Sequence, residues 1–395
     1  MAEKENRCKI ARRCGGCKYQ GVEYRKQLKR KQDYIDGLLG SFGKPEKIIG
    51  MENPFYYRNK VHHAFTKDRS GNIISGPYEA GSHWILQSDN CLIEDRESQE
   101  IMHGIRGLMK RLRVRPYNED SGYGTLRHVL IRKGFQSGQI MVVLVIGSDR
   151  FPAEKAFVRE LLKLSSKIKT VVLNYNGKKT SMILGEREKV MYGPGYIYDE
   201  LCGKKFRISS KSFYQVNPVQ TEILYKLAVQ YAGLTGSERV FDAYCGVGTI
   251  GLVASEAAGE VIGVELNEDA VRDAKINARE NKIETAKFYQ GDAGAFMNKM
   301  ASKKEKVDVV FMDPPRSGSS IKFMDAVVRL RPEKVVYISC GPESLARDLR
   351  YFRGNGYKIE KIQPVDMFPF TEHLETIVLL SKRKIDVNKN MKSIC

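Results

Sequence analysis

The period of hydrophobic positions changes near residue 205. Before that point, two runs rich in β-branched residues are separated only by FQSG, and this pattern predicts a β-hairpin over 125–134 and 139–147. Apolar residues at helical spacing predict helices over 22–40 and 152–164, and another strand is expected at 170–176. The middle of the chain is therefore expected to be an α+β region with antiparallel strands.

After residue 205, short apolar runs alternate with helical patterns. Strands are predicted at 239–244, 261–266, 287–292, 307–313 and 334–340. This alternation indicates an α/β fold with a parallel, doubly wound sheet. A last pair of strands, 357–368 and 373–382, follows without an intervening helix. A terminal antiparallel hairpin on such a Rossmann-like sheet is, by analogy, typical of class I methyltransferases.

These patterns divide the chain into five parts. We expect a cysteine-rich segment, a helical segment that packs on the last domain, a central α+β domain, a doubly wound α/β domain and a polar, disordered tail, at 1–20, 21–50, 51–204, 205–383 and 384–395.

The composition points to a polyanionic partner. The net charge is +19, and basic residues cluster in RKQLKRKQ (25–32), KRLRVR (110–115) and SKRK (381–384). Such an excess favours nucleic acid, although a basic protein without such a partner stays an alternative. No stretch is apolar enough to span a membrane, and the amino terminus does not resemble a secretion signal, so we expect a cytoplasmic protein without a membrane partner. In that compartment, eight cysteines favour metal or catalytic thiols over disulfides.

A glycine-rich turn at 241–252, FDAYCGVGTIGL, follows a predicted strand and precedes a helix. Its glycines and the helix amino terminus would let a ligand approach the backbone at Tyr244. Glu265 ends the next strand, where an acidic residue accepts hydrogen bonds from ribose hydroxyls, and Asp292 is within reach of an adenine amino group. An NAD site fits the glycines equally well. The motif DPPR, which starts at Asp313, favours S-adenosylmethionine instead, because it is typical of methyltransferases that act on bases.

The sequence VVYISCGPESLARDL places Cys340 at the end of a buried strand, where ligands bind in α/β sheets. A thiolate that adds to carbon 6 of uracil makes carbon 5 nucleophilic, and a base must later remove the carbon 5 proton. Cys340 would be the nucleophile, with its pKa lowered by the following helix. Glu375 begins the last strand and would be the base. A packing cysteine and a surface glutamate are the alternatives.

Five motifs in order resemble the bacterial RNA uracil-carbon-5 methyltransferases: FYQVNPVQTEILY, FDAYCGVGTIGL, DPPRSG, SCGPESLARDL and HLETIVLLS. The resemblance spans about residues 205–382. It implies 5-methyluridine formation in RNA, with Cys340 as nucleophile and Glu375 as base. It further implies S-adenosylmethionine binding by Gln215, Tyr244, Glu265, Asp292 and Asp313, and an aromatic contact of Phe213 with a flipped-out uracil. One departure is Gly341, where the family often has asparagine.

A second constellation comprises Cys8, Cys14, Cys17 and the distant Cys91. Four thiolates can hold zinc or an iron–sulphur cluster, and spacing alone does not choose between them. A redox role for CGGC is disfavoured because no strand precedes it. The spacing resembles the ribosomal-RNA branch of the family, which implies a four-iron, four-sulphur cluster that pins the amino-terminal segment to the middle domain.

The resemblance implies 23S ribosomal RNA as substrate, with transfer RNA as the alternative within the class and a non-catalytic RNA-binding protein as the alternative outside it. Some relatives carry an amino-terminal RNA-binding barrel ahead of the cysteines. Because Cys8 is close to the start, RNA binding is expected from the middle domain, its basic patches and the aromatics Phe55, Tyr56 and Tyr57. We expect a monomer.

Overall fold

The computed structural model describes residues 8–180 and 182–383, so the predicted tail at 384–395 lies outside the described residues. The chain forms two compact units. The described residues of Met1–Lys29, Gly50–Ile223 and Met367–His373 make the first unit, and those of Arg30–Ile49, Leu224–Asp366 and Leu374–Cys395 make the second.

The second unit is built on a seven-stranded sheet of order β11-β10-β9-β12-β13-β15-β14. Its strands are β9 Arg239–Ala243, β10 Glu260–Glu265, β11 Ala286–Gln290, β12 Val309–Met312, β13 Lys334–Ser339, β14 Tyr357–Val365 and β15 Glu375–Lys382. The pairs among β9 to β13 are parallel, whereas β15 is antiparallel to both β13 and β14. The predicted doubly wound sheet with a terminal antiparallel hairpin is therefore confirmed.

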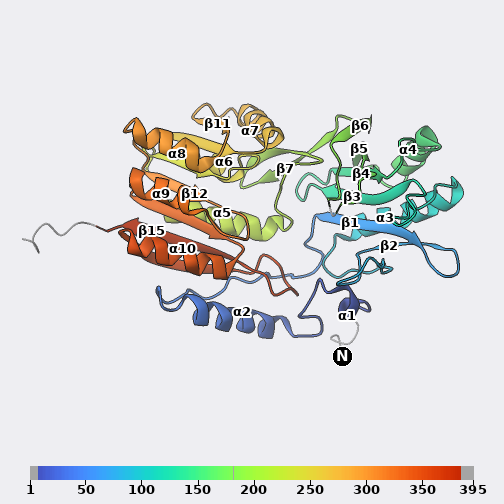
Figure 1. Cartoon of the computed structure of the whole chain (residues 1–395), viewed down its shortest axis with the longest axis horizontal. Helices are drawn as coiled ribbons and strands as arrows, with labels where there is room; N and C mark the ends of the chain where they lie inside the picture. The colour runs from blue at the N-terminus through green and yellow to red at the C-terminus, as the bar shows by residue number, and fades with distance from the viewer. Residues whose placement is uncertain (1–7, 181, 384–395) are drawn as a thin grey trace, which may run out of the picture. The chain divides into compact units, whose positions relative to one another are not determined.

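Helices cover this sheet because successive side chains of each strand point to opposite faces. One set of alternating strand residues, including Phe241 and Tyr337, packs against α8 Ala293–Ser302, α9 Ile321–Leu330, α10 Pro342–Gly354 and the end of α2 Tyr24–Leu39. Figure 1 shows α8, α9 and α10 along this face. On the opposite face, Gly251 of α6 Thr249–Ala254 lies against Asp242 and Val261. The remaining helices of this unit include α7 Glu268–Glu280 and most of α5 Pro218–Ala232.

One residue of the basic stretch 25–32 belongs to the interior. Lys31 is buried, and its ammonium lies 2.6 Å from a carboxylate oxygen of Asp366, which is buried too. Removing one partner of a buried ion pair typically costs about 3–5 kcal/mol because the other charge is left uncompensated, so Lys31 belongs to the core and not to a surface for a polyanion. Arg25, Lys26 and Lys29 of the same stretch are exposed.

The first unit contains a six-stranded sheet of order β2-β1-β3-β4-β5-β6 and a β7–β8 hairpin. Its strands are β1 Lys60–Lys67, β2 Ile73–Gly76, β3 Leu126–Lys133, β4 Ile140–Ile146, β5 Ile168–Tyr175, β6 Arg187–Tyr192, β7 Tyr196–Leu201 and β8 Lys204–Ser209. Its helices are α1 Ala11–Cys14, α3 Arg96–Arg111 and α4 Glu154–Leu162. The predicted β3–β4 hairpin is confirmed, but β4 and β5 are parallel. The antiparallel prediction was wrong there because α4 forms a crossover that returns the chain to the same edge.

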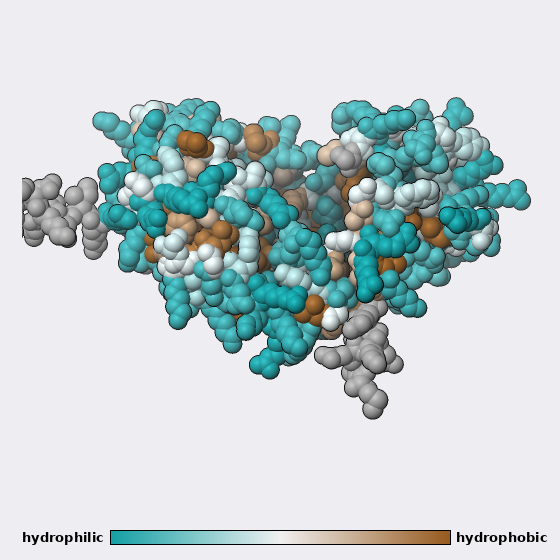
Figure 2. All heavy atoms as spheres, turned by 60° about the horizontal axis from the view of Figure 1, so that its bottom comes forward, coloured by the Kyte–Doolittle hydropathy of each residue, from teal (hydrophilic) through white to brown (hydrophobic). Residues whose placement is uncertain are grey.

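On the face seen in Figure 2, most exposed side chains are hydrophilic and hydrophobic atoms form small, separate groups. Within residues 8–180 and 182–383, the structure contains no helix with the length and apolar character that a membrane crossing requires.

Candidate functional site

Cys340 lies one residue beyond β13, in the turn that leads into α10. The strand residues 335–339 are buried, whereas Cys340 is half-buried. Ser339 and Gly341 close the turn, because the Gly341 N–H donates to the Ser339 hydroxyl at 3.2 Å. Pro342 occupies the first turn of α10, where its missing N–H costs no hydrogen bond. The thiol is therefore held at the carboxyl end of a central strand, as predicted.

Glu375 reaches the same edge from β15. This strand runs antiparallel to β13, with Thr376 opposite Ser339, so that the start of β15 lies beside the end of β13. Glu375 is buried, and its Oε2 atom has no hydrogen-bond partner within the described part of the chain. Burial and the neighbouring Asp313 carboxylate raise the pKa of Glu375 well above its usual value. In its ionised form, a buried carboxylate with a raised pKa and an oxygen without a partner among the described residues is suited to receive a proton.

Asp313 follows β12 and completes a group of three acids with Cys340 and Glu375. Its pKa is raised by burial. Burial, Glu375 and Asp313 together raise the pKa of the Cys340 thiol to about 11. The following helix is expected to lower this pKa, but the net shift is upward, because desolvation and two adjacent carboxylates raise it. A cation bound beside these groups would favour their ionised forms, and a sulfonium has that charge.

The glycine-rich turn after β9 has the backbone geometry of a ligand loop. Tyr244 adopts a φ of 61°, a left-handed conformation that is uncommon for a bulky residue. Glu265, at the end of β10, accepts the N–H of Gly246 at 3.2 Å and the N–H of Asn267 at 2.9 Å. These bonds hold the Glu265 carboxylate at the edge of the turn while each oxygen keeps a lone pair for a ligand hydroxyl.

Two acidic residues near this turn accept backbone N–H groups of helices. Asp242 accepts the Gly251 N–H at 2.9 Å inside α6 and is buried. Asp292 accepts the Ala295 N–H at 2.7 Å as the amino-terminal cap of α8. Its capping role fixes the Asp292 side chain at the carboxyl edge of the sheet, beyond β11.

Asp348 of α10 is a residue that the sequence reasoning did not single out, although it lies within SCGPESLARDL. It is buried and accepts the Ser319 N–H at 2.8 Å and the Tyr337 hydroxyl at 2.7 Å. Ser319 in turn lies 3.2 Å from the Tyr244 hydroxyl, oxygen to oxygen. Asp348 thus joins the loop after Asp313 to the helix after Cys340.

The surroundings of Gly341 account for a glycine where the family often has asparagine. A Cβ atom at this position would lie 2.4 Å from the Arg316 carbonyl oxygen and 2.7 Å from the Ser344 hydroxyl. An asparagine here would require the loop after Asp313 to move. In this chain, Gly341 therefore allows that loop to pack directly against the turn that carries the thiol.

Phe213 and Gln215 belong to the first unit. Phe213 has 65% of its surface exposed, which suits an aromatic that stacks on a base. The Gln215 side chain is largely buried, and its backbone carbonyl accepts the Asn59 amide at 3.3 Å. The segment that carries both residues is thereby fixed to the start of β1.

The four predicted cluster cysteines also lie in the first unit. Burial, Cys14 and Cys8 raise the pKa of Cys17 to about 12. Burial and Glu94 raise the pKa of Cys91 above its usual value, and Cys17 adds to the effect. Cys17 and Cys91 both pack against the core group of Tyr57, Ile93 and Phe370.

Each of Cys14, Cys17 and Cys91 has another cysteine of this set among the groups that raise its pKa, and soft thiolates are the ligand type that iron–sulphur clusters use. Among the described residues, however, no three His, Cys, Asp or Glu side chains are arranged as a metal-binding group. The residue types suit a cluster, but the described residues do not place these thiols as a set of metal ligands.

Of the aromatics expected to contact RNA, Tyr57 is buried, with 4% of its surface exposed, and its hydroxyl donates to the Pro369 carbonyl at 3.0 Å. The prediction that Tyr57 binds RNA is therefore wrong, because this side chain belongs to the core beside the cysteines. Phe55 packs against the same core group, and Tyr56 lies beneath the guanidinium of Arg96.

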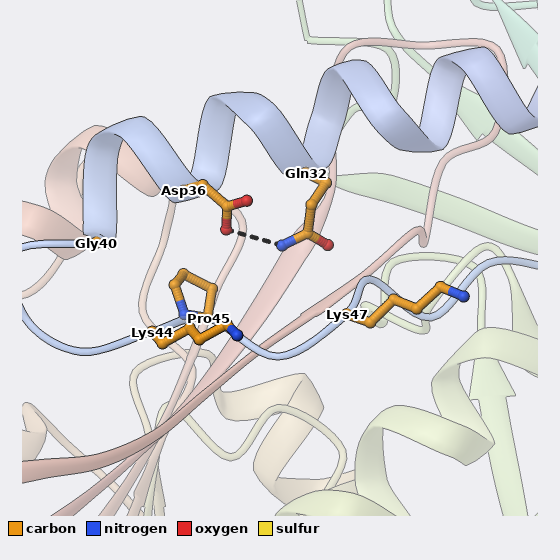
Figure 3. Close-up of a pocket in the computed structure, with 6 residues that line it drawn as sticks. All are labelled: Gln32, Asp36, Gly40, Lys44, Pro45 and Lys47. Carbon is orange, nitrogen blue, oxygen red and sulfur yellow. Dashed lines mark hydrogen bonds between the residues drawn. The ribbon is translucent and has the colours of Figure 1, made fainter.

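A pocket of about 510 Å³ lies between α2 and residues 44–47 in the second unit. Figure 3 shows its lining residues, with Gln32 bonded to Asp36. Gln32 also donates to the Glu46 carbonyl at 3.2 Å and accepts the Ile48 N–H at 2.6 Å. The side-chain amide of Gln32 thus holds residues 46–48 on α2. None of the predicted site residues lines the pocket.

The profile of the family described as tRNA (Uracil-5-)-methyltransferase matches residues 23–383 of this chain. An uncharacterized RNA methyltransferase of Clostridium acetobutylicum is 43% identical over 382 residues, which are 95% of this chain and 83% of that protein. Another from Caldanaerobacter subterraneus subsp. tengcongensis is 40% identical over 380 residues, covering 95% of this chain and 84% of that protein.

Among solved structures, the Pyrococcus abyssi tRNA (uracil-54, C5)-methyltransferase in complex with S-adenosyl-L-homocysteine is similar with a TM-score of 0.77 and 27% identity. The match covers 92% of this chain and 85% of that one. It confirms the class I methyltransferase fold.

Proposed function

Because this chain belongs to the tRNA (uracil-5-)-methyltransferase family and is an RNA methyltransferase, we propose that it converts a uridine of 23S ribosomal RNA to 5-methyluridine. The observation that carries the proposal is the gathering of Cys340, Glu375 and Asp313 at the carboxyl edge of one sheet. We expect a cytoplasmic, monomeric enzyme.

In the proposed mechanism, the Cys340 thiolate adds to carbon 6 of the uracil, and this addition makes carbon 5 nucleophilic. S-adenosylmethionine, when bound, supplies an electrophilic methyl group to carbon 5. The unpartnered oxygen of Glu375 then takes the carbon 5 proton, and the Cys340–carbon 6 bond breaks to release the thiolate. Tyr244, Glu265, Asp292, Asp313 and Gln215 would hold the donor, and Phe213 would stack on the target base.

The glycine turn and its acidic neighbours support S-adenosylmethionine as donor. The two backbone bonds of Glu265 leave each of its oxygens able to accept a ribose hydroxyl, and the acidic group around Asp313 suits a cationic sulfonium. The related Pyrococcus abyssi enzyme is described with S-adenosyl-L-homocysteine, which agrees with this choice of donor.

Two RNA classes compete as substrate. The pattern of Cys8, Cys14, Cys17 and Cys91 resembles the ribosomal-RNA branch and favours 23S ribosomal RNA. The similar Pyrococcus abyssi enzyme acts on transfer RNA, which makes transfer RNA the second candidate.

Mapping 5-methyluridine in ribosomal and transfer RNA, from cells with and without this gene, tests the proposal. We expect one or more positions in 23S ribosomal RNA to lose the modification completely when the gene is deleted. Loss confined to transfer RNA would select the second candidate. Unchanged 5-methyluridine in both RNA classes would contradict the proposed function.

We further propose that Cys8, Cys14, Cys17 and Cys91 hold a four-iron, four-sulphur cluster. Such a cluster would tie α1, which ends at Cys14, to the segment around Cys91, far away in the sequence. The role of the cluster would be structural, because bonds between thiolates and iron would constrain the chain much as a disulfide does.

Protein purified without oxygen is therefore expected to be brown and to contain iron. Cys17→Ser or Cys91→Ser should lose most of the iron, because each removes one of four ligands. The control is Cys202→Ser, which changes a half-buried thiol outside the proposed cluster and should keep the iron. Zinc without iron in the wild-type protein, or equal iron in all variants, would refute the assignment.

A further inference from the structure

Two cations face each other on the sheet of the first unit. Lys60 at the start of β1 is the direct partner of Arg132 on β3 in an antiparallel pair, so both side chains project from the same face. Like charges in directly opposite positions are destabilising. The guanidinium of a third basic residue, Arg58, is held beside them, because its Nε donates to the Lys60 carbonyl at 3.2 Å.

Lys60 has no counterion among the described residues. It is half-buried, and in residues 8–180 and 182–383 the charged groups that shift its pKa are the cations Arg132 and Arg58. Burial, Arg132 and Arg58 lower the pKa of Lys60 to about 8, so the ammonium is still mostly protonated near neutral pH. A charge that is partly desolvated and surrounded by cations is costly unless an anion joins it.

The neighbouring imidazoles add to this face. The His62 ring lies 4.9 Å from that of His128, centroid to centroid. His62 Nε2 is buried and has no hydrogen-bond partner in the described part of the chain. Burial, His128, His63 and Lys60 lower the pKa of His62, so this ring is neutral and can donate or accept a hydrogen bond.

Arg132 also connects this face to Phe213. Its Nη2 atom donates to the Ser210 carbonyl at 3.1 Å and to the Ser212 carbonyl at 2.6 Å. Ser212 directly precedes the exposed Phe213. An anion at Lys60 would therefore lie next to the segment that presents this aromatic ring.

We propose that Lys60, flanked by Arg58 and Arg132, binds the phosphate of a nucleotide adjoining the uridine that stacks on Phe213. A ribose phosphate brings both the missing negative charge and an attached base at the spacing of one nucleotide. Phosphate contacts of this kind position a nucleic acid without reading its sequence. The inference rests on the proposed function only for the uridine on Phe213.

The test measures binding of a short, single-stranded oligouridylate by fluorescence anisotropy at several salt concentrations. Lys60→Met should weaken binding on the order of tenfold, as expected for a lost hydrogen bond to a charged group. It should also reduce the slope of log affinity against log salt by about 0.7, the value for one phosphate of a single strand. Lys60→Arg, which keeps the charge, should have an affinity and a salt slope close to those of the wild type.

Lys67→Met is the matched control, since Lys67 is an exposed lysine at the other end of β1. It should leave the affinity and the slope near those of the wild type. Lys60→Met is expected to fold normally, because it removes a partly buried cation without a counterion, and its unfolding temperature checks this.

Equal affinity and slope in the wild type and Lys60→Met, or no binding of the oligouridylate by the wild type, would overturn the inference. If 5-methyluridine is formed while Lys60→Met binds normally, the phosphate site alone fails. If Lys60→Met weakens binding but no RNA is methylated, the proposed function alone fails.

Discussion

Cys340→Ala is expected to reduce methyl transfer to uridine by at least about 10⁴-fold, because the activation of carbon 5 depends on the covalent bond to carbon 6. The sulfur is half-buried at the end of β13 and small, so alanine should leave the fold intact. Single-turnover transfer of a radiolabelled methyl group to RNA is the measurement.

Cys202→Ala is the control for this variant, because it removes another half-buried thiol that lies in the first unit. It should retain the wild-type rate. A Cys340→Ala enzyme that methylates at more than a tenth of the wild-type rate would remove this thiol from the mechanism.

Glu375→Gln is expected to trap the covalent intermediate. The amide keeps the size of the side chain but cannot take the carbon 5 proton, so turnover should fall about 10²–10⁴-fold. The step before it needs only Cys340 and the methyl donor, and RNA bound to protein should therefore accumulate. Denaturing gels would show this product with ordinary uridine RNA.

We expect Glu375→Gln to fold as stably as the wild type, so that lost turnover reports on the chemistry. Glu375 is buried, one of its oxygens has no partner within the described residues, and its raised pKa favours the neutral form. Replacing a protonated carboxyl by an amide of the same size should change the free energy of unfolding little. Glu360→Gln, an exposed change on β14, is the control. Normal turnover in Glu375→Gln, with no accumulated RNA adduct, would exclude Glu375 as the base.

Much of the second unit could be predicted because its parallel strands are buried on both faces. Such strands form short apolar runs that are visible without any knowledge of their neighbours. The position of Cys340 followed from the same pattern, since a run that stops before a glycine and a proline marks the end of a strand. Glu375 could be placed at the start of β15 for a similar reason.

Less of the first unit could be predicted from the sequence. β1 carries Lys60, His62 and His63 within eight residues, so its polar positions hide the strand. The backbone of this part of β1 is paired with β3, whereas β2 pairs with the later part, from Ala64 to Lys67. The parallel pairing of β4 and β5 was also missed, since it depends on where α4 returns the chain.

The electrostatics of the thiol could not be predicted from local sequence. Asp313 and Glu375 are far from Cys340 along the chain and meet it only through the order of strands in the sheet. In the local sequence only the following helix bears on the thiol, and its dipole would lower the pKa of Cys340, whereas burial and the two carboxylates raise it. Likewise, the role of Gly341 depends on the Arg316 carbonyl, which belongs to a different loop.

The central claim is that Cys340 bonds to the uracil ring during methyl transfer. The most direct test incubates the enzyme with S-adenosylmethionine and RNA containing 5-fluorouridine, whose fluorine blocks the final elimination. Mass spectrometry of protease and nuclease digests then locates the nucleotide. We expect a methylated 5-fluorouridine on the peptide that contains Cys340. A stable adduct on any other residue, or methylated RNA with no adduct at all, would contradict it.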